Sequence, residues 1–243
     1  YNIEVTKGSN ASLTLEGVTA TAGNTGSSMI DNWGTLTISS GDYSGGLNVV
    51  KSEENSKLTI NGGKFTLDYA TNGYTGVILA YGTTTITDGE FIQSLTTAGR
   101  WDHPTVILTG VVEGYTATTV VTGGTFTNNK SDESIFRGVG KGTSDNFEVS
   151  GGTFNKSVPD AYFADGYIAQ KVDGVYTVVG PYEAKIGTTG YKTLADAITA
   201  ANESDSAKTI TLLQDVVVAD QIVINNTSSK TITLDLNKFT LTS

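Results

Sequence analysis

Charged side chains recur at one position of this 243-residue chain, immediately before a recurring aromatic residue. If the strands that carry them stack at the usual 4.8 Å, Asp42 and Glu90 lie about 10 Å apart with Lys64 between them. That approaches the carboxyl separation of an inverting glycosidase, roughly 6.5 to 9.5 Å. An intervening ammonium favours two ionised carboxylates, so we predict an exposed charge ladder and no catalytic residue. The series is Asp42, Lys64, Glu90, Thr125 and Thr153.

The single histidine, His103, stands between Asp102 and Pro104. A histidine next to a carboxylate could act as a general base or bind a metal ion. Adjacent residues of an extended segment point in opposite directions, and a lone histidine in a chain without cysteine makes a weak zinc site. We therefore predict that His103 lies in a loop, within residues 94–104, and has no chemical role.

Aromatic side chains outside the regular series suggest a binding surface. Three of them precede an inward-facing apolar residue by five or six positions, and another stands beside an arginine in a long connection. A row of rings along one edge could follow a polysaccharide, and an exposed tryptophan offers a flat apolar face to a sugar or protein. The alternative is that the rings only pack over bends of the chain. The candidate ligand-binding residues are Trp33, Tyr81, Trp101, Tyr115 and Arg100.

The sequence predicts no metal site and no cofactor, with calcium left as an alternative. Scattered acidic and amide side chains could supply oxygens, but no EF-hand loop and no Asp-containing glycine-rich nonapeptide is present. The residues in question are Asp31, Asn32, Asp88, Asp132 and Glu133.

These residues must be positioned by a repeated phrase, clearest at residues 58–65 (LTINGGKF). Threonine alternating with a branched apolar residue has the period of a strand with one buried face. The Gly-Gly, Ser-Gly or Asp-Gly that follows can take positive φ, so the chain bends and an aromatic returns to the core. Further copies begin at residues 36, 84, 119 and 147, with a degenerate copy at 13.

The spacing of the core aromatics predicts the architecture. They are 22, 26, 35 and 28 residues apart, longer than a hairpin return and close to one coil of a parallel β-helix, roughly 20 to 25 residues. Additional apolar segments between the phrases supply the other strand of each coil. We predict an all-β parallel β-helix whose core is a ladder of Tyr43, Phe65, Phe91, Phe126 and Phe154.

The domain organisation follows from where the phrases stop. Residues 1–156 are predicted to form the coils, and residues 157–180 a closing β-hairpin with an Asp173-Gly174 turn. Residues 181–243 are predicted to hold one short capping α-helix near 193–202, with Thr193 as its N-cap, and then strands. Those strands are expected at 209–213, 221–224, 231–236 and 239–241.

The C-terminal part resembles a known family. Tyr191–Ile198, Thr209–Val216 and Thr231–Asn237 are similar to the opening of pectate-lyase-like right-handed parallel β-helix modules, which belong to large adhesin-like surface proteins of gut Gram-positive bacteria. Val149–Phe154 with residues 165–178 is similar to their end. The resemblance implies an extracellular location at the bacterial cell surface. The family's opening stands last here, so we expect a segment cut out of phase, in which residues 181–243 begin a following module or cap another copy.

Composition narrows the partners. The net charge of −10 and pI near 4.5 argue against nucleic acid, which requires clustered Lys and Arg. No apolar run in this segment reaches membrane-spanning length. We expect a host or microbial glycan or protein surface as partner, together with head-to-tail self-association. Three functions compete: a non-catalytic structural or adhesive module, a carbohydrate-binding module, and a polysaccharide lyase or glycoside hydrolase.

Overall fold

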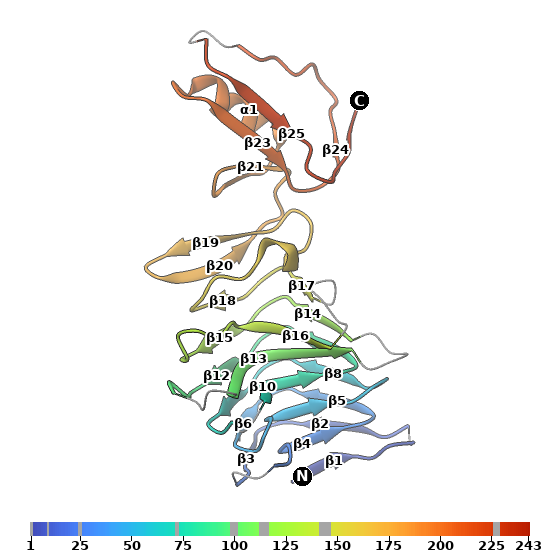
Figure 1. Cartoon of the computed structure of the whole chain (residues 1–243). Coiled ribbons are helices and arrows are strands. Elements are labelled where there is room, and N and C mark those ends of the chain that lie inside the picture. Colours follow the sequence, from blue (N-terminus) through green and yellow to red (C-terminus); the bar gives the residue numbers. More distant parts are fainter. Residues whose placement is uncertain are drawn as a thin grey trace. The chain divides into compact units, whose positions relative to one another are not determined.

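The computed structural model describes residues 2–8, 10–23, 26–70, 73–97, 102–111, 117–140, 147–225 and 229–243. The chain divides into two compact units (Figure 1). Unit 1 comprises Tyr1–Tyr162 and Lys171–Thr177, and unit 2 comprises Phe163–Gln170 and Val178–Ser243. The described part is nearly all β-structure with one short α-helix, so the predicted fold class is confirmed.

Unit 1 is a parallel β-solenoid in which each strand pairs with the strand one coil further along. The first sheet runs β1 (Ile3–Val5), β4 (Ile30–Asn32), β7 (Val50–Ser52), β10 (Gly73–Ala80), β13 (Asp102–Val111) and β16 (Phe136–Gly140). The second runs β2 (Ser12–Leu15), β5 (Thr35–Ile38), β8 (Lys57–Ile60), β11 (Thr83–Ile86), β14 (Thr118–Val121) and β17 (Phe147–Val149). The third runs β3 (Val18–Thr21), β6 (Gly41–Ser44), β9 (Lys64–Leu67), β12 (Glu90–Gln93), β15 (Thr125–Asn128) and β18 (Thr153–Phe154).

The repeated phrase forms a strand of the second sheet, a bend and a strand of the third. In β8, Leu58 and Ile60 are buried while Lys57 is exposed, which is the alternation that the sequence predicts. The bend at Gly63 has a φ of 105°, which a residue with a Cβ atom rarely adopts. The next strand can therefore present its aromatic inward.

The core aromatics stack face to face along unit 1. Successive ring centroids are 5.1, 5.0, 4.9 and 5.0 Å apart, and the rings are within 13° of parallel. The side chains are at most 1% exposed. Since each ring contacts the ring of the next coil, the stack links all the coils that contain it. Its members are Tyr43, Phe65, Phe91, Phe126 and Phe154.

One predicted loop is partly strand, which corrects the sequence interpretation. The segment 94–104, expected as a loop, ends in β13, which begins at Asp102, and the neighbouring strand β10 begins at Gly73. These two strands pair in parallel from their first residues, Gly73 with Asp102. Each extension supplies the hydrogen-bond partners of the other, so the backbone does not need to project as a loop.

A hairpin extends the third sheet beyond β18. β19 (Ile168–Val172) and β20 (Val175–Val179) flank Asp173 and Gly174, whose φ values of 50° and 85° suit a tight two-residue hairpin turn. β20 pairs antiparallel with β18, Tyr176 opposite Phe154. A short 3-10 helix, η2 (Asp160–Tyr162), precedes the hairpin and was not predicted.

Unit 2 places one helix against a small sheet. The sheet order is β22 (Thr189–Tyr191), β21 (Ala184–Ile186), β23 (Lys208–Leu212) and β25 (Ile232–Asp235), and β24 (Val216–Val217) pairs with β26 (Leu241–Thr242). Helix α1 (Leu194–Glu203) begins where predicted: the Thr193 hydroxyl accepts from Asp196 N at 3.1 Å. Its buried face joins a core of Ala184, Leu194, Ala197, Ile198, Ala201, Ile210, Leu212 and Val216.

The strand predicted at 221–224 is wrong. Its backbone is engaged by a side chain instead: Asn202 Nδ2 donates to Val223 O at 3.0 Å, and Asn225 N donates to Asn202 Oδ1. Val223 and Ile224 are 58% and 50% exposed. The Asn202 side chain occupies backbone groups that a neighbouring strand would otherwise pair with. The alternation of apolar residues at 221–224 therefore did not lead to a strand.

Candidate functional site

The bend between the first and second sheets of unit 1 brings two candidate aromatics into one row. Asn32, Ser52 and Ala80 end their strands in register, so the next residues, Trp33, Glu53 and Tyr81, stand in successive coils. We call these three residues the corner row. Trp33 and Tyr81 each stand five residues before an inward-facing isoleucine, so the sequence predicted that they share a row. Glu53 was not predicted, because only aromatic residues were compared at this position.

Trp33 is held in one orientation. Its indole Nε1 donates to Asp31 Oδ2 at 3.0 Å, and its backbone N donates to Val5 O at 2.9 Å. The Lys7 ammonium lies 4.3 Å from the centroid of the indole ring. The half-buried ring is therefore held by two side chains, Asp31 and Lys7, and its backbone is held by Val5.

The corner backbone around Trp33 is fixed from inside. The buried Asn32 donates from Nδ2 to Ser52 Oγ and to Lys57 O, and its Oδ1 accepts from Gly34 N at 3.1 Å. These bonds tie one coil to the next at the corner. The sequence pattern indicated Asn32 only as an alternative calcium ligand and not as the residue that joins the coils, because a single buried asparagine has no periodic signature.

Charged groups lie behind the corner row. Lys51 pairs with Glu53, and the Lys51 ammonium lies 5.7 Å from the Tyr81 ring centroid. Asp31 and Glu53 are 1% and 3% exposed, and Oδ1 of Asp31 is buried without a hydrogen-bond partner among the described residues. Both carboxyl groups are thus shielded from a bound sugar.

Burial decides the direction of the pKa shift for two of these groups, Glu53 and Tyr81, but not for Lys51. It raises the pKa of Glu53, against the opposing effect of Lys51, and it raises the pKa of the Tyr81 hydroxyl. Burial alone would lower the pKa of Lys51, but the hydrogen bond and charge of Glu53, with the charge of Asp31, raise it. The lysine is therefore held as an ammonium. A carboxyl with a raised pKa can act as a general acid, but at 3% exposure Glu53 has no surface to offer a glycosidic oxygen.

A pocket of about 400 Å³ opens over Trp33. It is lined by Lys7, Gly8, Trp33, Glu54 and Asn55. An aromatic floor with amide, carboxylate and ammonium groups around it is a surface suited to a polyhydroxylated ligand.

The other candidate binding residues are outside the described part of the chain. Arg100, Trp101 and Tyr115 belong to the segments 98–101 and 112–116, about which the structure gives no information. Their inclusion in one edge with Trp33 and Tyr81 stays a prediction.

The acidic series is exposed and interrupted by a lysine. Asp42, Lys64 and Glu90 are aligned in adjacent coils of the third sheet. Lys64 Nζ lies 3.4 Å from Glu90 Oε2, with the side chains 47% and 49% exposed.

His103 lies in β13 and not in a loop, which corrects the sequence interpretation. Its Nδ1 is 2.8 Å from Glu133 Oε1, and Glu133 also pairs with Arg137. Lys156 Nζ donates to the backbone oxygens of Lys130 and Glu133. This cluster fastens residues 130–133 to the coils through a carboxylate that is 5% exposed. Residues thirty positions apart meet here, which no local spacing indicated.

The groups considered for calcium have other partners. Asp31 accepts from Trp33, Asp88 Oδ1 accepts from Gly89 N, and Asp132 pairs with Lys130. Among the described residues, no group of three or more His, Cys, Asp or Glu side chains is placed to hold a metal ion.

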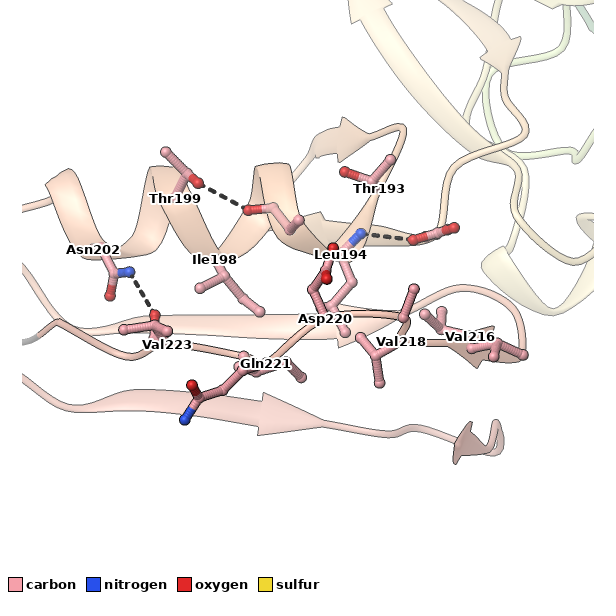
Figure 2. A pocket seen from close by; sticks show the side chains of 15 residues that line it. Thr193, Leu194, Ile198, Thr199, Asn202, Val216, Val218, Asp220, Gln221 and Val223 are labelled. Carbon is pink, nitrogen blue, oxygen red and sulfur yellow. Dashed lines mark hydrogen bonds between the residues drawn. The ribbon is translucent and has the colours of Figure 1, made fainter. Parts of the chain in front are cut away.

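Unit 2 contains a larger pocket, of about 500 Å³, between α1 and residues 216–223 (Figure 2). Leu194, Ile198 and Val218 supply apolar walls, and Asp220 and Gln221 lie on the chain opposite the helix. Glu183 Oε2, on another wall, accepts from Leu194 N at 2.7 Å and is engaged in capping the helix. The sequence did not predict this pocket.

Comparisons with protein-family models, curated proteins and solved structures find no match. The resemblance to pectate-lyase-like modules therefore rests on the residues quoted above. The structure supports its coarser part, a parallel β-solenoid.

Proposed function

We propose that this chain is a non-catalytic structural and adhesive module of a bacterial cell-surface protein. The observation that carries the proposal is the aromatic stack, in which one interior row of rings links successive coils. A solenoid of this kind is extended by adding coils and presents its corners and edges to partners. The resemblance to adhesin-like modules supports the extracellular setting.

The arrangement of acidic groups favours binding over catalysis. Asp31 and Glu53, two of the carboxyl groups near the corner row, are buried, and the exposed pair of the third sheet, Asp42 and Glu90, is separated by Lys64. A glycan array combined with an activity screen on polyuronides tests the proposal. Retention of a glycan or mucin without turnover supports it, whereas hydrolysis or elimination that is lost in Glu90→Gln would support the enzyme alternative.

A second candidate function is carbohydrate binding along the corner row. The specific observation in its favour is the pocket over Trp33, together with the internal bonds that hold the ring. Rings that merely cover a bend do not need an adjoining pocket of about 400 Å³. Titration of glycans against Trp33→Ala and Tyr81→Ala variants tests this function.

We also propose that copies associate end to end through unit 2. β25 is the last strand of its sheet in the described part of the chain, and it presents Leu234 and the following Leu236 at 36% and 41% exposure. Unpaired edges with apolar side chains favour strand addition. Sedimentation velocity should show association that Leu234→Lys abolishes and that Val172→Lys, at a 67% exposed hairpin position, does not.

No helix in the described part of the chain has the length and apolar character needed to cross a membrane.

A further inference from the structure

The lengths of the corners between the first and second sheets alternate along unit 1. Six residues separate β1 from β2, two separate β4 from β5, four separate β7 from β8, and two separate β10 from β11. A two-residue corner turns close to the core, whereas a longer corner reaches outward. The short corner that holds Trp33 and Gly34 is therefore recessed between two longer ones. We call this recess the Trp33 notch.

The walls of the notch come from the longer corners. Lys7 and Gly8 belong to the six-residue corner, and Glu54 and Asn55 belong to the four-residue corner. The second wall is a tight turn: Ser56 N donates to Glu53 O at 3.1 Å, and Asn55 takes a φ of 62°. This turn places Glu54 and Asn55 at the pocket, with Asn55 exposed. The floor is the Trp33 ring.

The floor is anchored more firmly than a surface ring requires. Asp31, which is 1% exposed, accepts the indole N–H at 3.0 Å. Because the Asp31 side chain is buried, water does not compete for this hydrogen bond. The ring plane is thus set in advance, which lowers the entropy cost of stacking a ligand on it.

The charges around the notch indicate the class of ligand. The nearby ionisable groups are two lysines, Lys7 and Lys51, against three carboxylic acids, Asp31, Glu53 and Glu54. Lys51 is already paired with Glu53, and the whole chain carries a net charge of −10. A uronate or sulfated sugar would therefore lack a cationic excess to offset its own charge. Neutral hydroxyl groups suit the carboxylate and the amide.

We propose that the Trp33 notch binds one pyranose unit of a neutral glycan, which displaces the Lys7 ammonium from its place over the indole ring, stacks there, and is hydrogen-bonded through hydroxyls to Glu54 and Asn55. The inference rests on the second proposed function and specifies its site and ligand class. Tyr81 lies two coils beyond Trp33 in the same row, about 10 Å along the stack. A glycan chain seated in the notch and running along the row reaches Tyr81, so longer oligosaccharides bind more tightly than a disaccharide.

The test is calorimetric titration of the whole chain with cellohexaose, laminarihexaose, mannohexaose and hexagalacturonate. We expect at least one neutral hexasaccharide to bind, its Kd to rise about tenfold or more in Trp33→Ala, and hexagalacturonate not to bind. The tryptophan fluorescence of a Trp101→Phe variant, which leaves Trp33 as the only indole, should change on saturation with the sugar.

Two further variants distinguish a loss of sugar binding from a loss of folding. Asn55→Gly removes the amide while retaining a residue that tolerates positive φ, and we expect a several-fold rise in Kd with an unchanged melting temperature. Tyr176→Ala is the matched control, since Tyr176 also has a lysine near its ring, Lys171 at 4.9 Å, but stands on the hairpin away from the notch. It should leave the Kd unchanged.

The possible failures are distinguishable. Binding that survives both Trp33→Ala and Asn55→Gly would overturn the notch as the site and leave carbohydrate binding intact. Tighter binding of hexagalacturonate than of every neutral hexasaccharide would overturn the ligand class. No binding of any of these probes, nor of any glycan on the array, would overturn the carbohydrate-binding function and this inference together.

Discussion

The two units of this chain bury their cores by different means. Unit 1 repeats one residue type at one position, so that Phe65, Phe91 and Phe126 each contact an equivalent ring above and below. Unit 2 has no such repeat among its described residues, and helix α1 covers its sheet with Leu194 and Ile198. Unit 1 therefore has a core whose parts are mutually dependent, and unit 2 has a core that depends on one helix.

The difference extends to the surface. In unit 1, large apolar side chains of the strands are mostly inside, whereas unit 2 exposes Val217, Val223 and Leu236 at 77%, 58% and 41%. A repeated coil provides every inner side chain with a neighbour in the next coil. Association is accordingly proposed for unit 2 and ligand binding for the corners of unit 1.

The largest effect should come from removing one ring of the stack. Phe91→Ala deletes a fully buried ring between two others, and we expect a loss of about 3 to 5 kcal/mol in the free energy of unfolding of unit 1. Urea denaturation followed by tryptophan fluorescence measures it, since both tryptophans, Trp33 and Trp101, belong to unit 1.

The matched control for that variant is Phe239→Ala, which removes a partly buried ring of unit 2. It should leave the fluorescence-detected transition in place. Equal shifts in the two variants would show that the stack is not a separate source of stability.

A smaller loss is expected from crowding a bend. A Cβ atom at Gly151 would stand inside contact distance of the Thr122 carbonyl oxygen one coil away. Gly151→Ala should therefore cost about 1 to 3 kcal/mol of unfolding free energy by the same assay. Gly26→Ala, where nothing lies within 4 Å of the added atom, is the control. A neutral Gly151→Ala would mean that the coils can separate at this bend without cost.

The repeat explains how much of the fold was predictable. Threonine–apolar alternation and the spacing of Phe65 and Phe91 are local signals that recur, so they predict the coils and the stack. Helix α1 was predicted from Thr193, Asp196 and one apolar face, again a local pattern. Where a prediction failed, at residues 221–224, a side chain from another segment, Asn202, decided the outcome.

The candidate site was predictable only in part for the same reason. The offsets of Trp33 and Tyr81 could be counted from the phrases, so their common row was foreseen. Their surroundings could not be, because the pocket depends on unequal corner lengths and on the buried partner Asp31. The pairing of His103 with Glu133 likewise joins residues of different coils.

For unit 2, loss of the helix cap should have a moderate effect. Thr193→Ala removes the hydroxyl that accepts from Asp196 N, and we expect helix α1 to lose about 1 kcal/mol. Hydrogen exchange measured by mass spectrometry over residues 194–203 should become faster, with residues of β8 and β11 unaffected. Thr199→Ala, whose hydroxyl donates to Ala195 O within the helix, is the control and should preserve protection. Faster exchange in both units would contradict their independence.

The smallest effect should come from the charge ladder on the third sheet. Lys64 and Glu90 are half-exposed and 3.4 Å apart, so water and salt screen their attraction. A double-mutant cycle of Lys64→Met and Glu90→Gln should give a coupling of about 0.5 kcal/mol or less in dilute buffer, vanishing at about 1 M salt. This outcome would assign the stability of unit 1 to its interior rings. A coupling energy several times larger that persists in salt would show that the Lys64–Glu90 pair contributes substantially to the stability of unit 1. It would then weaken the contrast between a core stabilised by repeated aromatic rings and a core covered by a single helix.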